Sequence, residues 1–471
     1  MNRETAAWGA GTRWQTRRRF LRALAIGGGT GAAAQLVVGC AGGGATPAGG
    51  EAGGPVGNPS KAVTITVWHA WDGPREPLMQ TIMERLKAQY PNLTVEQTIV
   101  QMWQGANVEK FGAAVAAGSA PDVTMLYDIY IPQFGPETRT MQPLDDWVRR
   151  DKLSLKQIFY DADVEGMQLE GKTWLLPHTA PIQPVNVAYS QDLALRAGYD
   201  LDKTPPQSWD ELLQVATKLT VRDGAGISQL GADLGPGAGL FEAYMGTVGA
   251  AAFSADGTKA TFNEPKAVET MEWLVRARQT LGGRSAIQAL QEAHRGQELF
   301  QQARKQAIVH HNYSIYFAFP QQYPDLKFGA FPIVPQQKGA PMALPHKQAW
   351  GWGTVAASKE KDAAWLLVKK MTADEDGGGY LQVEQGRPSP IRKVNESGEF
   401  KQNNPYWQTV VKTMEQRWKR PPSFIPPDAQ KAFTDAAAAI GAEEVAVRSG
   451  LDEGTKLAQA ALDQYWATRR K

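Results

Sequence analysis

The sequence predicts an α/β protein with two lobes. Three apolar segments, at 63–68, 93–100 and 123–127, have the pattern of β-strands, and the two stretches between them have the periodicity of helices. This strand–helix–strand–helix–strand order predicts a mostly parallel sheet with helices on both faces. The chain has 471 residues, more than one compact core usually holds, so we expect a second lobe of the same construction.

The first strand leads into the segment on which the predicted site is centred. In VTITVWHAWD (63–72), β-branched residues recur with a period of two, which is typical of a half-buried strand. A helical face follows from Leu78 to Tyr90 and stops at Pro91. The next helix is expected at 104–117, with Gly118 as the residue that ends it.

Aromatic and polar residues stand at the carboxyl ends of all three strands. In open α/β sheets, ligands bind beyond these ends. The residues there are of types that could bind a polar, ring-shaped molecule, so we predict a binding surface at this edge of the sheet. They are Trp68 and His69, Gln101 and Trp103, and Tyr127 and Asp128.

The chain is then expected to cross to the second lobe and to return. Residues 174–187 are apolar and rich in proline, which favours a crossing strand. Ser208 and Glu211 have the spacing of a capping box that opens a helix. A strand that returns to the first lobe is predicted at 347–356, followed by a helix at 358–371.

Composition excludes several classes of protein. Hydrophobic residues make up 42% of the chain and charged residues 21%, as in ordinary globular proteins. The net charge of +2 comes from the first 39 residues, and the remainder has 44 basic and 47 acidic residues, a net charge of −3. We therefore expect no nucleic-acid partner. The single cysteine excludes internal disulfides and thiolate metal cages, and we expect no metal and no cofactor.

The amino end resembles a twin-arginine export signal of a lipoprotein. Arg17 and Arg18 form the arginine pair, a mildly apolar run follows at 23–38, and LVVGC at 36–40 resembles a bacterial lipobox. The apolar run is too short and too weak for a spanning helix. The resemblance implies that residues 1–39 are removed and that Cys40 is acylated; the alternative is a buried cysteine in an ordinary helix.

Residues 40–60 are rich in glycine and cannot build a core, so we expect a lipidated tether. As a coil it would span roughly 25 Å. The chain would then be lipid-anchored to the outer face of the cytoplasmic membrane. The first lobe is expected to comprise 61–180 and 335–375, and the second lobe 181–334 and 376–471.

Six segments in order through nearly the whole mature chain resemble family 1 of the extracellular solute-binding proteins of ABC importers, the group that carries sugars. The segments are VTITVWHAW, AGSAPDVTMLYD, EGKTWLLP, VAYSQDLALRAGY with PQSWDEL, AFSADGTKATFNEPKAVETMEWL, and WGWGTVAASKEKDAAWLLVKKM. The resemblance implies a two-lobe periplasmic-binding-protein-like fold of type II, whose hinge strands let the lobes close over a ligand. It also implies delivery of the ligand to the permease subunits, with no chemistry. The chain has Ser190 where the family usually has asparagine after the tyrosine.

A sugar or oligosaccharide is the expected ligand, because aromatic rings cover its C–H faces while carboxylates, amides and arginine pair its hydroxyls. In the first lobe the candidates are Trp68, His69, Trp71, Asp72, Asp128, Trp350 and Trp352. In the second lobe they are His178, Glu242, Tyr244, Asn312, Tyr313 and Arg387. No catalytic residue is assigned.

Each of these residues could instead have a purely structural role or be an ordinary surface residue. Strand alternation places Trp350 and Trp352 on one face, which is either ligand-facing or core, and the glycines between and after them would let a ligand approach the backbone. His178 is expected either in the cleft or as a cap of the hinge. Asp128 and Arg387 could be ordinary solvated residues.

Two other classes of function remain as alternatives. One is a binder of a different solute, such as a peptide, a phosphodiester or a metal chelate. The other is an exported carbohydrate-active enzyme that uses two carboxylates. No GxSxG, HExxH or P-loop pattern occurs in the sequence, so we predict that the protein is a monomeric binding protein and not an enzyme.

Overall fold

The structure, a computed structural model, describes residues 55–101, 105–179, 186–316, 318–342, 349–415 and 425–467. All of them belong to one compact unit, Ala52–Lys471. Cys40, the predicted signal, most of the tether and Trp103 lie outside the described residues.

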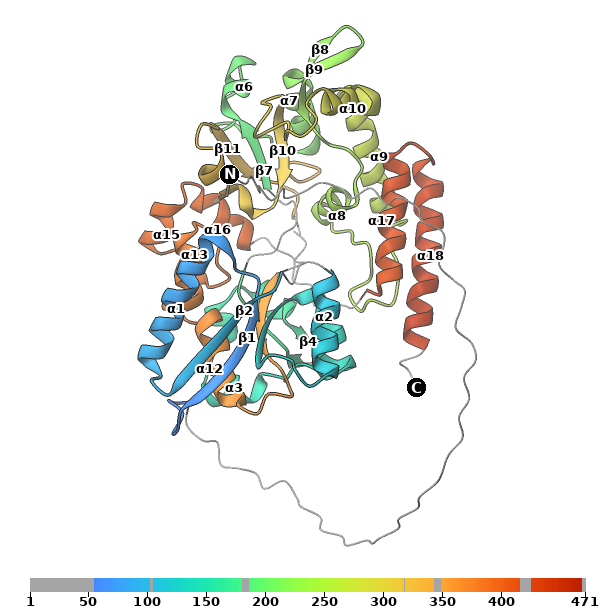
Figure 1. Cartoon of the computed structure of the whole chain (residues 1–471). Helices are drawn as coiled ribbons and strands as arrows, with labels where there is room; N and C mark the ends of the chain where they lie inside the picture. Colours follow the sequence, from blue (N-terminus) through green and yellow to red (C-terminus); the bar gives the residue numbers. More distant parts are fainter. Residues whose placement is uncertain are drawn as a thin grey trace. The chain divides into compact units, whose positions relative to one another are not determined.

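The first sheet has the strand order β2-β1-β3-β12-β6 (Figure 1). Its strands are β1 Val63–His69, β2 Leu93–Ile99, β3 Val123–Tyr127, β6 Leu176–Pro177 and β12 Trp350–Thr354. β1 pairs in parallel with β2 and β3, whereas β12 pairs antiparallel with β3 and β6. The returning strand predicted at 347–356 is therefore confirmed as β12, and it joins the first sheet next to β3.

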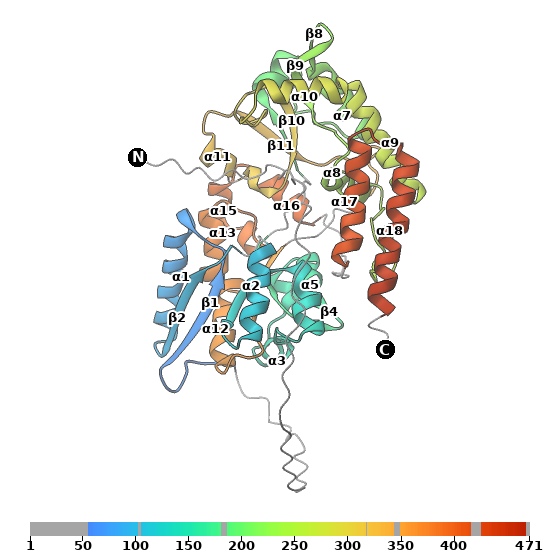
Figure 2. The same ribbon diagram turned by 45° about the vertical axis from the view of Figure 1, so that its right-hand side comes forward.

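The helices predicted for this part of the chain are also confirmed. They are α1 Glu76–Gln89, α2 Gly105–Ala116 and α12 Lys361–Thr372. In both views α1 and α2 lie on opposite sides of β1 (Figures 1 and 2). Gly118 ends α2 with a positive φ of 69°, and the backbone N–H groups of Gly118 and Ser119 donate to Val115 and Ala114. These bonds satisfy carbonyls that the helix leaves open at its end.

The second sheet has the order β11-β7-β10-β9-β8. Its strands are β7 Asn186–Ser190, β8 Val221–Asp223, β9 Gly226–Ala232, β10 Gln306–His311 and β11 Phe328–Pro332. Only the pair of β9 and β10 is parallel in this sheet. The two-lobe α/β fold class is confirmed, but both sheets are mixed, and the prediction of mostly parallel sheets is wrong.

Helices α7 Trp209–Leu219, α8 Ala238–Thr247, α9 Pro265–Thr280, α10 Gly283–Ala293, α17 Pro427–Gly441 and α18 Val447–Ala467 belong to the second part of the chain. α17 and α18 lie side by side in both views (Figure 2). The predicted capping box opens α7: Ser208 Oγ accepts from the N–H of Glu211 at 3.2 Å, and Glu211 accepts from the N–H of Gln207 at 2.7 Å.

Shorter elements connect these. They are α3 Asp145–Arg150, α4 Leu155–Ile158, α5 Asp161–Gly166, β4 Gln168–Leu169, β5 Lys172–Thr173, α6 Gln191–Arg196, α11 Ala318–Gln322, α13 Tyr380–Glu384, α14 Arg392–Asn395, α15 Gly398–Asn403 and α16 Trp407–Glu415, with short 3₁₀ or π turns η1 Gly73–Arg75, η2 Asp128–Tyr130, η3 Gln133–Glu137, η4 Tyr313–Tyr316 and η5 Glu375–Gly379.

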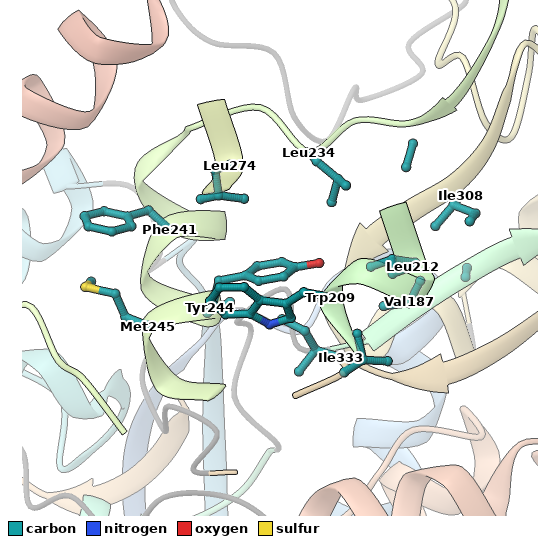
Figure 3. Close-up of a cluster of buried hydrophobic side chains, with 14 of the residues drawn as sticks. Val187, Trp209, Leu212, Leu234, Phe241, Tyr244, Met245, Leu274, Ile308 and Ile333 are labelled. Atoms are coloured by element: carbon teal, nitrogen blue, oxygen red, sulfur yellow. The ribbon is translucent and has the colours of Figure 1, made fainter. Parts of the chain in front are cut away.

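Each sheet has its own hydrophobic core. The second core contains Trp209, Tyr244, Phe241 and Ile308, whose side chains are drawn in Figure 3. It also takes in Phe159, Tyr160 and Val164, which fall in the predicted first lobe. The predicted lobe boundaries stay a prediction. No helix in the described ranges has the length and apolar character needed to cross a membrane.

Candidate ligand-binding site

Aromatic side chains gather where β1, β3 and β12 meet at one end of the first sheet. Trp71 follows β1, and Tyr127 is the last residue of β3. Because β12 is antiparallel to β3, its first residue, Trp350, stands opposite Tyr127 in the register. The rings of Tyr127 and Trp350 stack with centroids 3.7 Å apart, and Trp71 meets Trp350 edge to face at 6.4 Å. The sequence therefore brings three rings from distant segments to one sheet edge.

Trp71 is held in place by two histidines. Its backbone N–H donates to His69 Nδ1 at 3.2 Å, and its indole Nε1–H donates to His178 Nε2 at 2.9 Å. Because one nitrogen of each ring accepts, the other carries the proton. His69 Nε2 then donates to Gln97 Oε1 at 3.2 Å, and His178 Nδ1 donates to the carbonyl of Met371 at 2.7 Å.

Both histidines are kept neutral by their surroundings. Burial lowers the pKa of His69 to about 4, and the hydrogen bond to Gln97 offsets part of this effect. Burial also lowers the pKa of His178 to about 3, against the favourable bond to the Met371 carbonyl. A neutral imidazole is the form that the bonds to Trp71 require, since a protonated ring has no acceptor. Geometry and electrostatics agree on the protonation state.

His178 acts here as a support of Trp71. Its backbone N–H donates to the carbonyl of Trp350 at 2.8 Å, and its own carbonyl accepts from Gln382 at 3.1 Å. With both ring nitrogens engaged, its side chain orients an aromatic ring. Direct contact of His178 with a ligand stays a prediction.

Trp350 and Trp352 lie in one cluster, as strand alternation predicts. Trp352 contacts the rings of His178 at 5.6 Å and His69 at 6.2 Å, and it is fully buried. Trp350 is 3% exposed. Both indoles thus pack in the core of the first sheet. Trp350 contacts Trp71, and Trp71 lies beside the two arginines described below.

The expected role of the glycines of β12 is wrong. A Cβ atom at Gly351 would come within 2.8 Å of Leu175 Cβ and Met167 Sδ. At Gly353 it would come within 2.6 Å of Met141 Cε and 2.7 Å of Leu175 Cδ2. These glycines make room for core side chains that pack across the strand, and not for a ligand.

Two guanidinium groups stand over Trp71. Arg75 Cζ lies 5.2 Å and Arg387 Cζ 5.3 Å from the centroid of its ring. Arg387 was a predicted site residue and is placed beside Trp71, with 9% exposure. Burial and the positive charge of Arg75 lower the pKa of Arg387 to about 9. Guanidinium over an indole is a favourable contact.

The predicted acids and Trp68 have different surroundings. Asp72 accepts from Gln101 Nε2 at 2.6 Å and lies 3.8 Å from Arg75. Asp128 is buried, and its carboxylate accepts from the N–H of Ile129 at 2.8 Å. Trp68 is half-buried, with its ring against Phe111 at 6.2 Å.

The candidates of the second sheet are more dispersed. Tyr244 is fully buried and lies beside Trp209 (Figure 3). It also packs on Trp273, and its hydroxyl forms a hydrogen bond with His310 Nε2 at 2.8 Å. This places Tyr244 in the core and not at a surface. Glu242 on α8 and Asn312 after β10 are half-buried. Tyr313 begins η4, and its side chain lies outside the described residues.

Arg75 joins the site although it is not among the residues expected from the sequence, whereas Tyr127 and Gln101 belong to the predicted binding surface. Arg75 stands four residues after Trp71, across the proline-containing turn η1, and this spacing was the available signal. Tyr127 and Gln101 already stood at the strand ends. No local pattern in the sequence indicates that β12 pairs with β3 and brings Trp350 onto Tyr127.

A separate cavity of about 810 Å³ lies by the second sheet, with none of the predicted site residues in its wall. Arg278 and Arg284 line it, and both donate to the final carbonyls of α17, at Gly441 and Ala442. Cations at a helix carboxyl end stabilise the helix. These arginines therefore stabilise the carboxyl end of α17. No group of three metal-ligating side chains occurs in the part of the chain described here.

Curated relatives match part of the chain. The sn-glycerol-3-phosphate-binding periplasmic protein UgpB of Shigella dysenteriae is 25% identical over 172 residues, which is 35% of this chain and 37% of the relative. UgpB of Escherichia coli K12 is 24% identical over the same length. The match thus spans little more than a third of these relatives.

Solved structures are similar over most of the chain. CpMnBP1 with mannotriose bound has a TM-score of 0.69 at 23% identity, covering 84% of this chain and all of that one. The sugar-binding protein MalE of Xanthomonas citri has a TM-score of 0.71 at 15% identity, covering 87% of this chain and all of that one. At these identities the likeness establishes the fold.

The model of one protein family matches residues 72–378, well over half of the chain. That range contains every strand of the two sheets except β1. It includes Arg75, Tyr127, His178 and Trp350 of the site, whereas His69, Trp71 and Arg387 lie outside it. The expectation drawn from the six sequence segments is thereby confirmed, and this chain belongs to the bacterial extracellular solute-binding protein family.

Proposed function

We propose that this protein binds a sugar or oligosaccharide at the Trp71 site and delivers it unaltered to the membrane permease of an ABC importer. The observation that carries the proposal is the aromatic edge of Trp71, Tyr127 and Trp350, held rigid by two neutral histidines. Structural neighbours include proteins with bound mannotriose and mannobiose. The ligand would lie between the lobes, which would close by their hinge strands.

The magnitudes are consistent with binding through rings and charged groups together. Association costs roughly 4–15 kcal/mol of lost ligand freedom. Ring contacts contribute about 0.5–1.5 kcal/mol each beyond area burial. Hydrogen bonds to charged groups contribute roughly 1.5–3 kcal/mol each, and Arg75, Arg387 and Asp72 can supply them. Micromolar affinity, about −8 kcal/mol, is within reach.

A screen of the mature protein against neutral and charged saccharides tests this function. A ligand that binds only the folded state stabilises it by about 2.7 kcal/mol at a concentration one hundred times its Kd. We expect a rise in melting temperature and a change in tryptophan fluorescence with one class of saccharide. Products formed on incubation with oligosaccharides would instead favour an enzyme, and a response to peptides alone would favour a different solute.

We also propose that the protein is exported as a monomeric lipoprotein, anchored through Cys40 and held by the tether at 40–60. Support comes from the order of the arginine pair, the apolar run and the cysteine. In cells, Cys40→Ser should move the protein from the membrane fraction to the soluble exported fraction. Membrane association of Cys40→Ser equal to that of the unaltered protein would contradict the anchor.

A further inference from the structure

We propose that the Trp71 site takes a saccharide or polyol that carries an anionic group, and that Arg75 and Arg387 bind this group. The inference rests on the proposed function and narrows its ligand class. Arg75 reaches the site from the turn after β1, and Arg387 from the segment after α13. Their Cζ atoms lie 5.2 and 5.3 Å from the centroid of one and the same indole.

The fold ties the two arginines to each other. Arg75 Nε–H donates to Gln385 Oε1 at 3.0 Å, and Gln385 stands two residues before Arg387. Gln385 Nε2 in turn donates to the carbonyl of Leu381 at 2.8 Å, which fixes it on α13. Two distant segments are thus joined so that two cations approach one ring.

Gathering like charges in a buried place has an electrostatic cost. The positive charge of Arg75, together with burial, lowers the pKa of Arg387. Burial also lowers the pKa of Arg75, and the charge of Asp72 opposes that effect. Asp72 is only a partial offset, because its oxygen lies 3.8 Å from Arg75, beyond hydrogen-bond distance, and the side chain is 49% exposed. An anion bound beside both guanidinium groups would be attracted by each.

The geometry of the guanidinium group favours an oxyanion. Arginine presents its N–H groups in a planar fork that matches a carboxylate or a phosphate with two parallel bonds. When the flat face of a guanidinium contacts an indole, its N–H groups point sideways, away from the ring, and can still bond an oxyanion.

Pairs of ligands that differ only in charge test the inference on the mature protein. We would titrate glycerol 3-phosphate against glycerol, glucose 6-phosphate against glucose, and galacturonate against galactose, with mannotriose and maltose as neutral references. We expect the charged member of at least one pair to bind about tenfold tighter or more, a factor that each 1.4 kcal/mol supplies. The preference should shrink as NaCl is raised.

Variants assign the charge to its residues. Arg75→Gln and Arg387→Gln should each remove most of the preference, while Arg149→Gln, an exposed arginine on α3, should keep it. If Arg387→Gln unfolds the protein, Arg75→Gln and the salt dependence still decide. Equal binding of both members of every pair, or a preference unchanged in the two variants, would overturn the inference and leave the proposed function intact. If no saccharide of any kind bound, the proposed function itself would be contradicted.

Discussion

At the scale of single residues, the site depends on how Trp71 is fixed. An exposed indole that rotates would lose entropy on binding, whereas Trp71 is held through its backbone by His69 and through its ring by His178. A ring already held in its binding orientation reduces the ordering cost of association. Under the proposed function, the two histidines would contribute to binding without touching the ligand.

Replacing His178 by phenylalanine should weaken both stability and binding. The variant keeps an aromatic ring but leaves the Trp71 indole N–H and the Met371 carbonyl without the partners they now have. Each orphaned buried group costs about 1–3 kcal/mol. We expect urea unfolding to report a loss in this range or somewhat above it, and the saccharide affinity to fall as Trp71 becomes free to turn.

His294→Phe is the matched control, because His294 is half-buried at the end of α10, away from Trp71. Its unfolding free energy should stay within about 0.5 kcal/mol of the parent. If His178→Phe were as stable as this control and bound saccharide equally well, the support of Trp71 by His178 would have no energetic weight.

At the scale of elements, β12 carries the largest share of the site's packing. It lies between β3 and β6, and all five of its residues are buried. Its two tryptophans fill one side, and its two glycines leave space for Met141, Met167 and Leu175 on the other. The strand therefore alternates large and small residues to fit the layers on its two faces.

Gly353→Ala should destabilise the protein although it adds a single methyl group. The new Cβ would meet Met141 Cε at 2.6 Å and the carbonyl oxygen of Trp174 at 2.9 Å, and backbone atoms cannot move aside as a flexible side chain can. Overpacking of this kind costs typically about 1–3 kcal/mol. Thermal or urea unfolding of the variant would measure it.

Gly398→Ala provides the comparison, since nothing lies within 4 Å of its added Cβ and it stands at the start of α15. Alanine favours helix over glycine by roughly 0.5–1 kcal/mol, so this variant should be neutral or slightly more stable. A Gly353→Ala protein as stable as Gly398→Ala would show that β12 can shift to accept the methyl group.

These elements also show what the sequence could and could not reveal. Strand 123–127, the helix ends at Gly118 and Ser208 and the returning strand were predictable, because each depends on residues close in the chain. The glycines of β12 were misjudged because their neighbours come from residues 141–175. The mixed order of the second sheet likewise depends on which distant strands pair, and no local pattern encodes that choice.

At the scale of the whole molecule, the two sheets have separate cores, and histidines with a lowered pKa lie at both sheets. His69 and His178 lie by the first sheet, and His310 and His311 lie on β10 of the second. Burial lowers the pKa of His310 to about 3 and also lowers the pKa of His311. Four of the six histidines of the chain thus have a pKa lowered in the folded state.

This distribution predicts that stability falls as the pH is lowered from 6.5 to 5. A histidine with a folded pKa near 3 or 4 and an unfolded pKa near 6.5 binds a proton mainly when unfolded in that window, so the unfolded state gains. Its contribution is complete above about pH 6.5 and is lost as the pH falls toward the folded value. The loss per such histidine approaches about 1.4 kcal/mol per pH unit toward the acid end of this window, where the unfolded imidazole is almost fully protonated.

Urea unfolding at pH 7.5, 6.0 and 5.0 measures this slope above the pH range in which the carboxyl groups with a lowered pKa, those of Asp151, Asp200, Asp256 and Asp362, gain a proton. His178→Gln should reduce the slope by the share of one histidine. In the folded state His178 should stay neutral throughout this window, because its pKa lies near 3, so the bond from the Trp71 indole should persist until the protein unfolds. An unfolding free energy that stays level down to pH 5 would mean that these rings are protonated in the folded state at no cost, and the tautomers assigned to His69 and His178 would have to be abandoned.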